Sequence, residues 1–280
     1  MRLARAKVNL WLNVVGRRAD GYHLLDSLVV FTDLADTLEV GPSGGLSLTL
    51  EGPEAAGIAG EADNLVLRAA RLLADRAGVS PRAALRLAKH IPVAAGLGGG
   101  SADAAAALRG LVELWRVAMP EEELFDLAAE LGADVPMCLA GRAALASGVG
   151  EILRPAPPLP SCAILLVNPG TPLATPEVFA ARRGAFSVAN PAPSSWPDLA
   201  TLAAVLSARG NDLTDAAISL SPAIADVLDA LRRTHGARYA AMSGSGATCF
   251  ALYDTVEAAG RAATHLPAGW WRHAGLVVSG

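Results

Sequence analysis

A glycine-rich stretch that leads directly into a helical pattern constrains this chain more than any other feature. Residues 92–108 read PVAAGLGGGSADAAAAL, with four glycines in the five positions from Gly96 to Gly100. Glycine has no Cβ, so this backbone can adopt positive φ and approach a ligand closely. The alanines that follow are strong helix formers, and a helix that begins after such a loop directs unpaired N–H groups and a positive dipole end at the loop. The stretch therefore predicts a phosphate-binding loop.

The glycine stretch does not match the two best-known nucleotide motifs. No lysine follows Gly100, so the pattern GxxxxGK[ST] is absent. Ser101 and Asp103 stand where the pattern GxGxxG would need its last glycine. A tight connection without a ligand fits the same spacing, so other motifs have to decide.

Length and composition limit the kind of protein this chain can be. Its 280 residues are enough for one large or two moderate domains. The longest clean apolar run, residues 162–167, is far shorter than the roughly 20 residues of a membrane span. Residues 1–13 mix charged and apolar side chains, unlike a secretory signal. We therefore expect a cytoplasmic protein without a membrane partner.

Charge and cysteine content exclude further classes. The net charge is −4 and there is no basic run, which argues against a nucleic-acid partner. Cys138, Cys162 and Cys249 are odd in number and far apart, so neither a disulfide framework nor a clustered metal site is expected. Buried free thiols are the simpler interpretation.

The first strand predicted by the sequence has two different faces. From Leu3 to Val15 the residues alternate with a period of two. The even positions are apolar: Ala4, Ala6, Val8, Leu10, Leu12 and Val14. The odd positions carry Arg5, Lys7, Asn9, Trp11 and Asn13. This pattern predicts one buried face and one chemical face.

The rest of the first half mixes strands and helices. Strands are predicted at 24–31, 37–40, 46–50 and 84–89, and another at 143–147. Asp63 or Asn64 is expected to cap a helix that ends near Ala77 before Gly78. A second helix at 120–131 has three glutamates in its first turn and Gly132 at its end. Residues 132–136, GADVP, are expected to form a short connection.

Four prolines between 155 and 160 mark the expected boundary between two halves, 1–155 and 156–280. The second half predicts strands at 163–168, 237–242 and 248–253, with a glycine turn at 243–246. Helices are expected near 199–208 and 222–235, and a segment of low order at 189–197. No regular βαβ repeat is present, so the pattern favours the α+β class.

Six motifs resemble the GHMP kinase superfamily in order and approximate spacing. They are AKVNLWL at 6–12, GYH at 21–23, the stretch 92–107, GADVP at 132–136, GVGE at 148–151 and MSGSGA at 242–247. The resemblance covers nearly the whole chain. It implies an N-terminal ATP-binding domain like domain 2 of ribosomal protein S5, a C-terminal kinase domain, and an active site in the cleft between them.

The resemblance also implies a reaction. It is transfer of the γ-phosphoryl group of ATP, with Mg²⁺, to the 2-hydroxyl of a cytidine-diphosphate-linked methylerythritol in isoprenoid precursor synthesis. Another small-molecule kinase of the homoserine or mevalonate type remains open, as does a nucleotide-binding protein without catalysis. The expected partners are the small substrate and ATP, with the chain a monomer or weak homodimer. The Mg²⁺ ligands stay unassigned.

The same resemblance assigns the catalytic pair to Lys7 and Asp134. Phosphoryl transfer depends on positioning and on stabilising charge, so a carboxylate to accept the hydroxyl proton and an ammonium to hold the moving group suit it. The alternatives are a turn or helix cap for Asp134 and a solvated strand position for Lys7.

The binding residues follow from the resemblance as two sets. The ATP side comprises Pro92, Gly96, Leu97, Gly98, Gly99, Gly100, Ser101, Asp103, Asn64 and Lys89. The substrate side comprises Asn9, Tyr22, His23, Val149, Thr175, Phe179, Ser243 and Gly244. In these sets Tyr22 and Phe179 stack on cytosine and His23 hydrogen-bonds to it. The turn at 243–246 contacts the diphosphate or braces the glycine loop. Asp103 acts through Mg²⁺ or, more simply, as a helix cap.

Overall fold

The structure is a computed structural model that describes residues 1–58 and 64–278. Asp63, one of the two predicted caps, lies outside the described residues. The chain forms two compact units that do not follow chain order. The first comprises Met1–Lys7, Leu34–Val93 and Gly98–Gly141, and the second comprises Val8–Asp33, Ala94–Leu97 and Arg142–Gly280. The predicted division at residue 155 stays a prediction.

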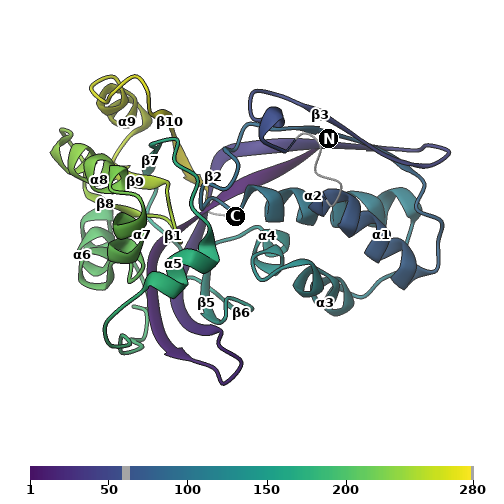
Figure 1. Cartoon of the computed structure of the whole chain (residues 1–280), viewed down its shortest axis with the longest axis horizontal. Helices are drawn as coiled ribbons and strands as arrows, with labels where there is room; N and C mark the ends of the chain where they lie inside the picture. The colour runs from purple at the N-terminus through teal and green to yellow at the C-terminus, as the bar shows by residue number, and fades with distance from the viewer. Residues whose placement is uncertain (59–63, 279–280) are drawn as a thin grey trace. The chain divides into compact units, whose positions relative to one another are not determined.

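The first unit packs four helices against strands. The helices are α1 (Leu65–Ala77), α2 (Gly99–Trp115), α3 (Glu121–Leu131) and α4 (Val135–Ala140). Strand β3 (Leu46–Glu51) runs parallel to β4 (Ala83–Ala88), and β4 runs antiparallel to the end of β2 (His23–Gly41). A short 3-10 helix, η1, spans Ala55–Ile58. Figure 1 shows the four helices gathered on one side of these strands. This packing positions the start of α2.

Local signals explain the helices of the first unit. The Asn64 side chain accepts a hydrogen bond from the N–H of Val66 at the start of α1, and Gly78 ends that helix in the left-handed conformation. Helix α2 is rich in alanine, and its buried alanines allow close packing against α1 and α4. Helix α1 was predicted with these ends, and a helix after the glycine loop was predicted without stated ends.

The second unit contains an antiparallel sheet in the order β10-β7-β9-β8. These strands are β7 (Ala163–Asn168), β8 (Tyr239–Met242), β9 (Cys249–Tyr253) and β10 (Trp271–Val278). The helices are α5 (Thr175–Ala181), α6 (Leu199–Arg209), α7 (Thr214–Leu220), α8 (Ala223–Arg233) and α9 (Val256–Ala263). In Figure 1 these helices carry the green to yellow colours of the C-terminal half.

A hairpin completes the second unit. Strand β5 (Ala144–Gly148) pairs with β6 (Ile152–Pro155) and with residues 25–29 of β2. Strand β1 (Arg2–Arg17) pairs with β2. All six residues of β7 are buried, as expected for a continuous apolar strand covered on both faces.

Several expectations were wrong in detail. The two strands predicted at 24–31 and 37–40 are one continuous strand, β2. Of the connection predicted at 132–136, residues 132–134 are non-helical, but Val135 and Pro136 already form the apolar first turn of α4, where proline fits. The odd-numbered face of β1 is also buried, since Lys7, Asn9, Trp11 and Asn13 are at most 6% exposed. The α+β class is confirmed.

The cysteines are free thiols. Cys162 and Cys249 are buried and Cys138 is half-buried. Burial raises the pKa of the Cys162 thiol to about 11 and raises the pKa of the other two thiols still further. Among the described helices, none is both long and apolar enough to cross a bilayer.

Candidate active site

Lys7 and Asp134 face each other in the first unit. The Lys7 Nζ lies 3.3 Å from Oδ2 of Asp134. The Lys7 side chain is only 7% exposed, whereas that of Asp134 is 41% exposed. Because the Lys7 ammonium is buried and the Asp134 carboxylate is partly exposed, a hydroxyl group that arrives from solvent can contact the carboxylate.

The local fold leaves the Asp134 carboxylate available. Helix α3 ends before Gly132, and Asp134 occupies the N-cap position of α4 with φ −87° and ψ −11°. Its side chain makes no capping hydrogen bond. The capping role considered for Asp134 from the sequence is therefore not what its side chain does.

The glycine loop packs directly on Lys7. Gly98 precedes α2 with φ +66°, and a Cβ built on it would lie 2.7 Å from Cγ of Lys7. The N–H of Ala102 donates to the carbonyl of Gly98, which starts the hydrogen-bond ladder of α2. The N–H groups of Gly99, Gly100 and Ser101 therefore precede that ladder, as the first groups of a helix do. This arrangement suits a phosphate group.

The first part of the loop belongs to the second unit and is braced by the turn at 243–246. The Ser243 hydroxyl donates to the carbonyl of Gly96 over 3.2 Å and accepts from the N–H of Asn9, also over 3.2 Å. The N–H of Thr248 donates to the carbonyl of Ala95. A Cβ at Gly96, where φ is +76°, would lie 2.5 Å from the carbonyl oxygen of Gly246, so this close approach requires glycine. Bracing is one of the two roles predicted for the turn.

A buried ionic cluster lies beside the start of α2. We use "the Lys89 cluster" for Lys89, Asp36 and Asp103, whose side chains are at most 3% exposed. The Lys89 Nζ donates to Asp36 and, over 2.7 Å, to Asp103. The Asp36 carboxylate also accepts the N–H groups of His90 and Ile91. The cluster thus joins β2, the turn after β4 and α2.

The structure corrects the simpler role expected for Asp103. Asp103 does not cap a helix, because the N-cap of α2 is Gly98. Asp103 lies in the second turn of α2, where its carboxylate accepts a hydrogen bond from Lys89. Its Oδ1 is buried without a hydrogen-bond partner among the described residues. Lys89 was placed on the ATP side by resemblance, and its ammonium is occupied by two carboxylates. A nucleotide contact by either residue stays a prediction.

Burial dominates the electrostatics of the Lys89 cluster. It raises the pKa of Asp103 to about 7, because loss of water and the neighbouring Asp36 outweigh the attraction of Lys89. Burial alone would lower the pKa of Lys89, but the charges of Asp103 and Asp36 outweigh it and raise that pKa. With one lysine facing two carboxylates, Asp103 is therefore partly protonated near pH 7.

Aromatic side chains predicted to bind the base meet in the second unit. The rings of His23 and Phe179 are stacked, with centroids 5.0 Å apart and planes 24° from parallel. Burial, followed by the charges of Arg17 and Arg182, lowers the pKa of His23, so the ring is neutral at pH 7. Tyr22 is 63% exposed and makes no ring contact with this pair among the described residues.

The remaining predicted residues have structural partners that the sequence did not show. The Asn9 amide donates to Ser27, whose hydroxyl donates to the carbonyl of Trp11. The Thr175 hydroxyl lies 2.7 Å from that of Ser245. The N–H of Val149 donates to Glu151, Asn64 caps α1, and Ser243 and Gly244 are buried within their turn. Pro92 is half-buried and Leu97 is buried.

Sequence reasoning missed Asp36. An aspartate within a strand usually indicates a solvated face, but Asp36 is fully buried. The antiparallel register that pairs Thr37 with Ala88 places Asp36 opposite Lys89. A usable signal was its position in the apolar alternation of β2, between the buried Leu34 and Leu38.

Two family matches define the class of protein. The GHMP kinases N terminal domain matches residues 64–142, and the GHMP kinases C terminal domain matches residues 190–270. The first range contains the glycine loop, Lys89, Asp103 and Asp134. The chain belongs to the GHMP kinases.

Curated relatives narrow the class. The chain is 55% identical over 271 residues to the 4-diphosphocytidyl-2-C-methyl-D-erythritol kinase of Paramagnetospirillum magneticum, covering 96% of this chain and 95% of the relative. It is 52% identical over 278 residues to the enzyme of the same name from Rhodospirillum rubrum, covering 98% and 91%. These matches confirm the predicted resemblance to the GHMP kinase superfamily. Within it, they confirm the resemblance to kinases that act on a cytidine-diphosphate-linked methylerythritol.

Solved structures agree with this placement. The crystal structure of a 4-(cytidine 5'-diphospho)-2C-methyl-D-erythritol kinase superposes with a TM-score of 0.80 at 40% identity, covering 100% of this chain and 99% of that one. A homoserine kinase from Cytophaga hutchinsonii superposes with a TM-score of 0.71 at 18% identity, covering 99% and 95%. The second similarity shows the shared fold alone.

Proposed function

We propose that this chain transfers the γ-phosphoryl group of ATP to the 2-hydroxyl of 4-diphosphocytidyl-2-C-methyl-D-erythritol. The observation that carries the proposal is the Lys7–Asp134 pair at 3.3 Å, with the Gly98 backbone packed on the stem of Lys7. Near-full-length similarity to kinases of that name supports the choice of substrate. We propose a cytoplasmic location, a monomer or weak homodimer, and no nucleic-acid partner.

The transfer step needs one acid–base group and one cation. In the proposed reaction the substrate hydroxyl oxygen bonds to the γ-phosphorus while the bond between that phosphorus and the β–γ bridging oxygen breaks. The hydroxyl proton passes to the Asp134 carboxylate, and ADP leaves with the bridging oxygen. The Lys7 ammonium stabilises charge on the transferred group. Because this ammonium is already buried, its attraction for the phosphoryl oxygens is stronger than in water.

The glycine loop holds the nucleotide tail in this proposal. The N–H groups of Gly99, Gly100 and Ser101, at the positive end of α2, donate to phosphate oxygens. Mg²⁺ carried by the nucleotide would neutralise part of the phosphate charge. Its ligands in this chain are unassigned.

The base is recognised by stacking. The half-buried ring of Phe179, stacked on His23, and the exposed ring of Tyr22 would stack on cytosine. The neutral His23 ring presents one donor and one acceptor to the base edge. Asn9, Val149 and Thr175 complete the proposed substrate side, with Ser243 and Gly244 at the diphosphate.

A coupled assay of ADP release tests the proposal. The full chain with MgATP is offered 4-diphosphocytidyl-2-C-methyl-D-erythritol, homoserine, mevalonate or galactose in parallel. We expect turnover with the cytidine-linked alcohol and a kcat/KM at least about 10³-fold lower with the others, since they lack the base that stacking and hydrogen bonds recognise. Equal turnover of homoserine or mevalonate would reassign the substrate. ATP binding without turnover of any alcohol would favour a non-catalytic protein.

A further inference from the structure

The Lys89 cluster adjoins the part of the glycine loop that begins α2. A Cβ built on Gly99 would lie 3.3 Å from Nζ of Lys89 and 3.1 Å from Cγ2 of Ile91. The buried ammonium therefore packs on the backbone that supplies the first N–H groups of the helix. Because these N–H groups are the ones proposed to hold the phosphates, a change in the charge of the cluster acts on the proposed phosphate site.

Lys89 is held in place through its backbone. Its N–H donates to the carbonyl of Glu51 over 2.7 Å, and its carbonyl accepts the N–H of Glu54 over 3.2 Å. A Cβ at Gly52, where φ is +92°, would lie 2.5 Å from the carbonyl oxygen of Lys89. The turn after β3 therefore fixes the backbone of Lys89, which keeps its ammonium at the start of α2.

The two carboxylates of the cluster differ in the hydrogen bonds that they accept. Asp36 accepts from Lys89 and from the N–H groups of His90 and Ile91. In the part of the chain that the structure describes, Asp103 accepts from Lys89, and its Oδ1 is buried without a partner. Donated hydrogen bonds stabilise an ionised carboxylate, and a buried anion with few donors is unfavourable. A proton that enters the cluster therefore binds to Asp103.

The charge of the cluster depends on that proton. One ammonium and two ionised carboxylates leave one negative charge, and protonation of Asp103 leaves none. The charged groups that act on Asp103 are Lys89 and Asp36, and burial raises the pKa of Asp103 to about 7. The cluster therefore changes its charge near neutral pH.

The other elements near α2 supply few titratable groups. Helices α1 and α3 contact α2, and their buried residues are apolar. Helix α4 brings Cys138 close to Asp103, and burial raises the pKa of that thiol, so it is neutral at pH 7. On β1, Lys7 packs on the glycine loop and lies 3.3 Å from Asp134. The exposed His90, next to Lys89, is the histidine that a test has to control for.

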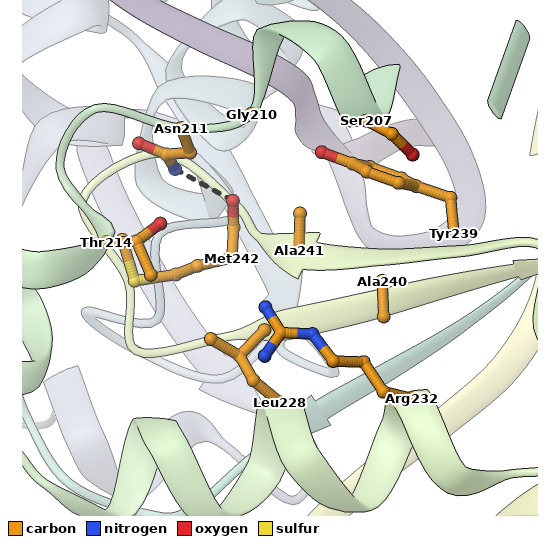
Figure 2. A pocket seen from close by; sticks show the side chains of 10 residues that line it. All are labelled: Ser207, Gly210, Asn211, Thr214, Leu228, Arg232, Tyr239, Ala240, Ala241 and Met242. Carbon is orange, nitrogen blue, oxygen red and sulfur yellow. Dashed lines mark hydrogen bonds between the residues drawn. The ribbon is translucent and has the colours of Figure 1, made fainter. Parts of the chain in front are cut away.

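The first part of the glycine loop is held by uncharged side chains. The Ser243 hydroxyl donates to the carbonyl of Gly96, and the Asn211 amide donates to the carbonyls of Met242 and Gly244, over 2.8 Å each. Figure 2 shows the Asn211 amide directed at the Met242 carbonyl, in the wall of a cavity of about 360 Å³. A hydroxyl and an amide do not change charge near neutral pH. The pH dependence of the loop therefore arises at the start of α2.

We propose that Asp103 is a positioning residue of the glycine loop that couples the binding of ATP to the uptake of a proton. The proton neutralises the Lys89 cluster when phosphates bind to the adjacent N–H groups, because a net negative charge beside them is unfavourable. With 3% of its side chain exposed, Asp103 acts through Lys89 and the start of α2. This inference rests on the proposed placement of ATP on the glycine loop.

Calorimetric titration of the full chain with MgATP, without an alcohol acceptor, measures the coupled proton. The titration is run at pH 7.5 in PIPES and in Tris, two buffers whose ionisation enthalpies differ, so the difference in observed enthalpy gives the number of protons taken up. We expect wild type to take up roughly 0.3–0.7 proton per MgATP. By the same linkage, the dissociation constant of MgATP should rise about 3- to 10-fold from pH 6.5 to 8.0.

Two variants assign the proton. Asp103→Asn should take up less than about 0.1 proton, and its dissociation constant should change less than about 2-fold over the same pH range. At pH 8.0 this variant should bind MgATP more tightly than wild type, whereas loss of a purely structural contact would weaken binding at every pH. His90→Gln, the matched control, should keep the proton uptake of wild type.

Each outcome decides. If MgATP binds and proton uptake is the same in wild type and Asp103→Asn, this inference is overturned and the proposed kinase reaction stands. If wild type does not bind MgATP below about 10 mM, both are overturned. Loss of uptake in His90→Gln would assign the proton to His90. If Asp103→Asn does not fold, wild type still decides, because a dissociation constant independent of pH without proton uptake contradicts the coupling.

Discussion

The backbone of Gly98 lies against the side chain of Lys7 so closely that no other residue fits at position 98. A Cβ there would be 2.7 Å from Cγ and 3.1 Å from Cε of Lys7. The start of the glycine loop and the buried ammonium are therefore positioned by each other. In the proposed reaction, this contact would link the loop that holds the phosphates to the cation that stabilises their transfer.

Gly98→Ala should displace Lys7 and lower kcat by at least about 10-fold, since misplaced catalytic groups lose much of their effect. Gly78→Ala is a matched control. Gly78 has φ +65°, nearly that of Gly98, but a Cβ there meets nothing within 4 Å. Both variants carry the left-handed strain of about 1–2 kcal/mol, so any further loss of stability or of kcat in Gly98→Ala reports the contact with Lys7. Equal kcat losses would attribute the effect to strain alone.

Asp134→Asn keeps the shape of the side chain and removes its capacity to accept a proton. We expect kcat to fall by about 10² to 10⁴, with little change in the dissociation constant of ATP measured by titration. Asp126→Asn, an exposed position on α3, serves as the control for loss of one carboxylate. Retention of wild-type kcat in Asp134→Asn would remove this residue from the chemical step.

The Lys89 cluster should make stability depend on pH near neutrality. Asp103 has a pKa of about 7 in the folded chain, above the unfolded value of 3.8, so the folded state binds the extra proton between these values. Its favourable contribution is complete below about pH 4 and is lost as pH rises through about 7. The slope is at most about 1.4 kcal/mol per pH unit.

Urea unfolding of wild type and Asp103→Asn between pH 5 and 8 measures this effect. The free energy of unfolding of the variant, minus that of wild type, should increase from pH 5 to 7 and then level off. Asp229→Asn, an exposed aspartate on α8, should show no such increase. Parallel curves for wild type and Asp103→Asn would contradict the raised pKa of Asp103.

Phe179→Ala should weaken binding of the cytidine substrate by about 1–3 kcal/mol, a rise in KM of roughly 5- to 160-fold, with kcat largely kept. Tyr22→Ala should act in the same direction. Phe186→Ala removes a half-exposed ring that lies under Arg182 rather than on His23, and it should leave KM within about 2-fold. An unchanged KM in Phe179→Ala would count against stacking as the mode of base recognition.

What could be predicted from the sequence depended on how local the signal was. Helix α1 was predicted with both ends because Asn64 and Gly78 act within one turn of it. The glycine loop was found for the same reason. Strand β10 was missed, because its pairing with β7 joins residues about a hundred positions apart and no short-range pattern encodes that.

The candidate site shows the same difference between local and long-range signals. Lys7 and Asp134 were identified through motif resemblance, and the structure brings the two side chains together. The role of Asp103 as a cap was wrong, since the choice between capping and an ion pair depends on where β4 delivers Lys89. Asp36 was missed because its burial arises from the register between β2 and β4.

Strand β1 also sets the distance between two of the predicted site residues through covalent geometry. Lys7 and Asn9 are two positions apart in this strand, so their Cα atoms are separated by about 6.6 Å and their side chains leave the same face. Inserting a single residue at position 8 would turn the amide to the opposite face of the sheet. The strand thus fixes the spacing of Lys7 and Asn9. Substitutions can change the chemistry of these two side chains far more easily than their spacing.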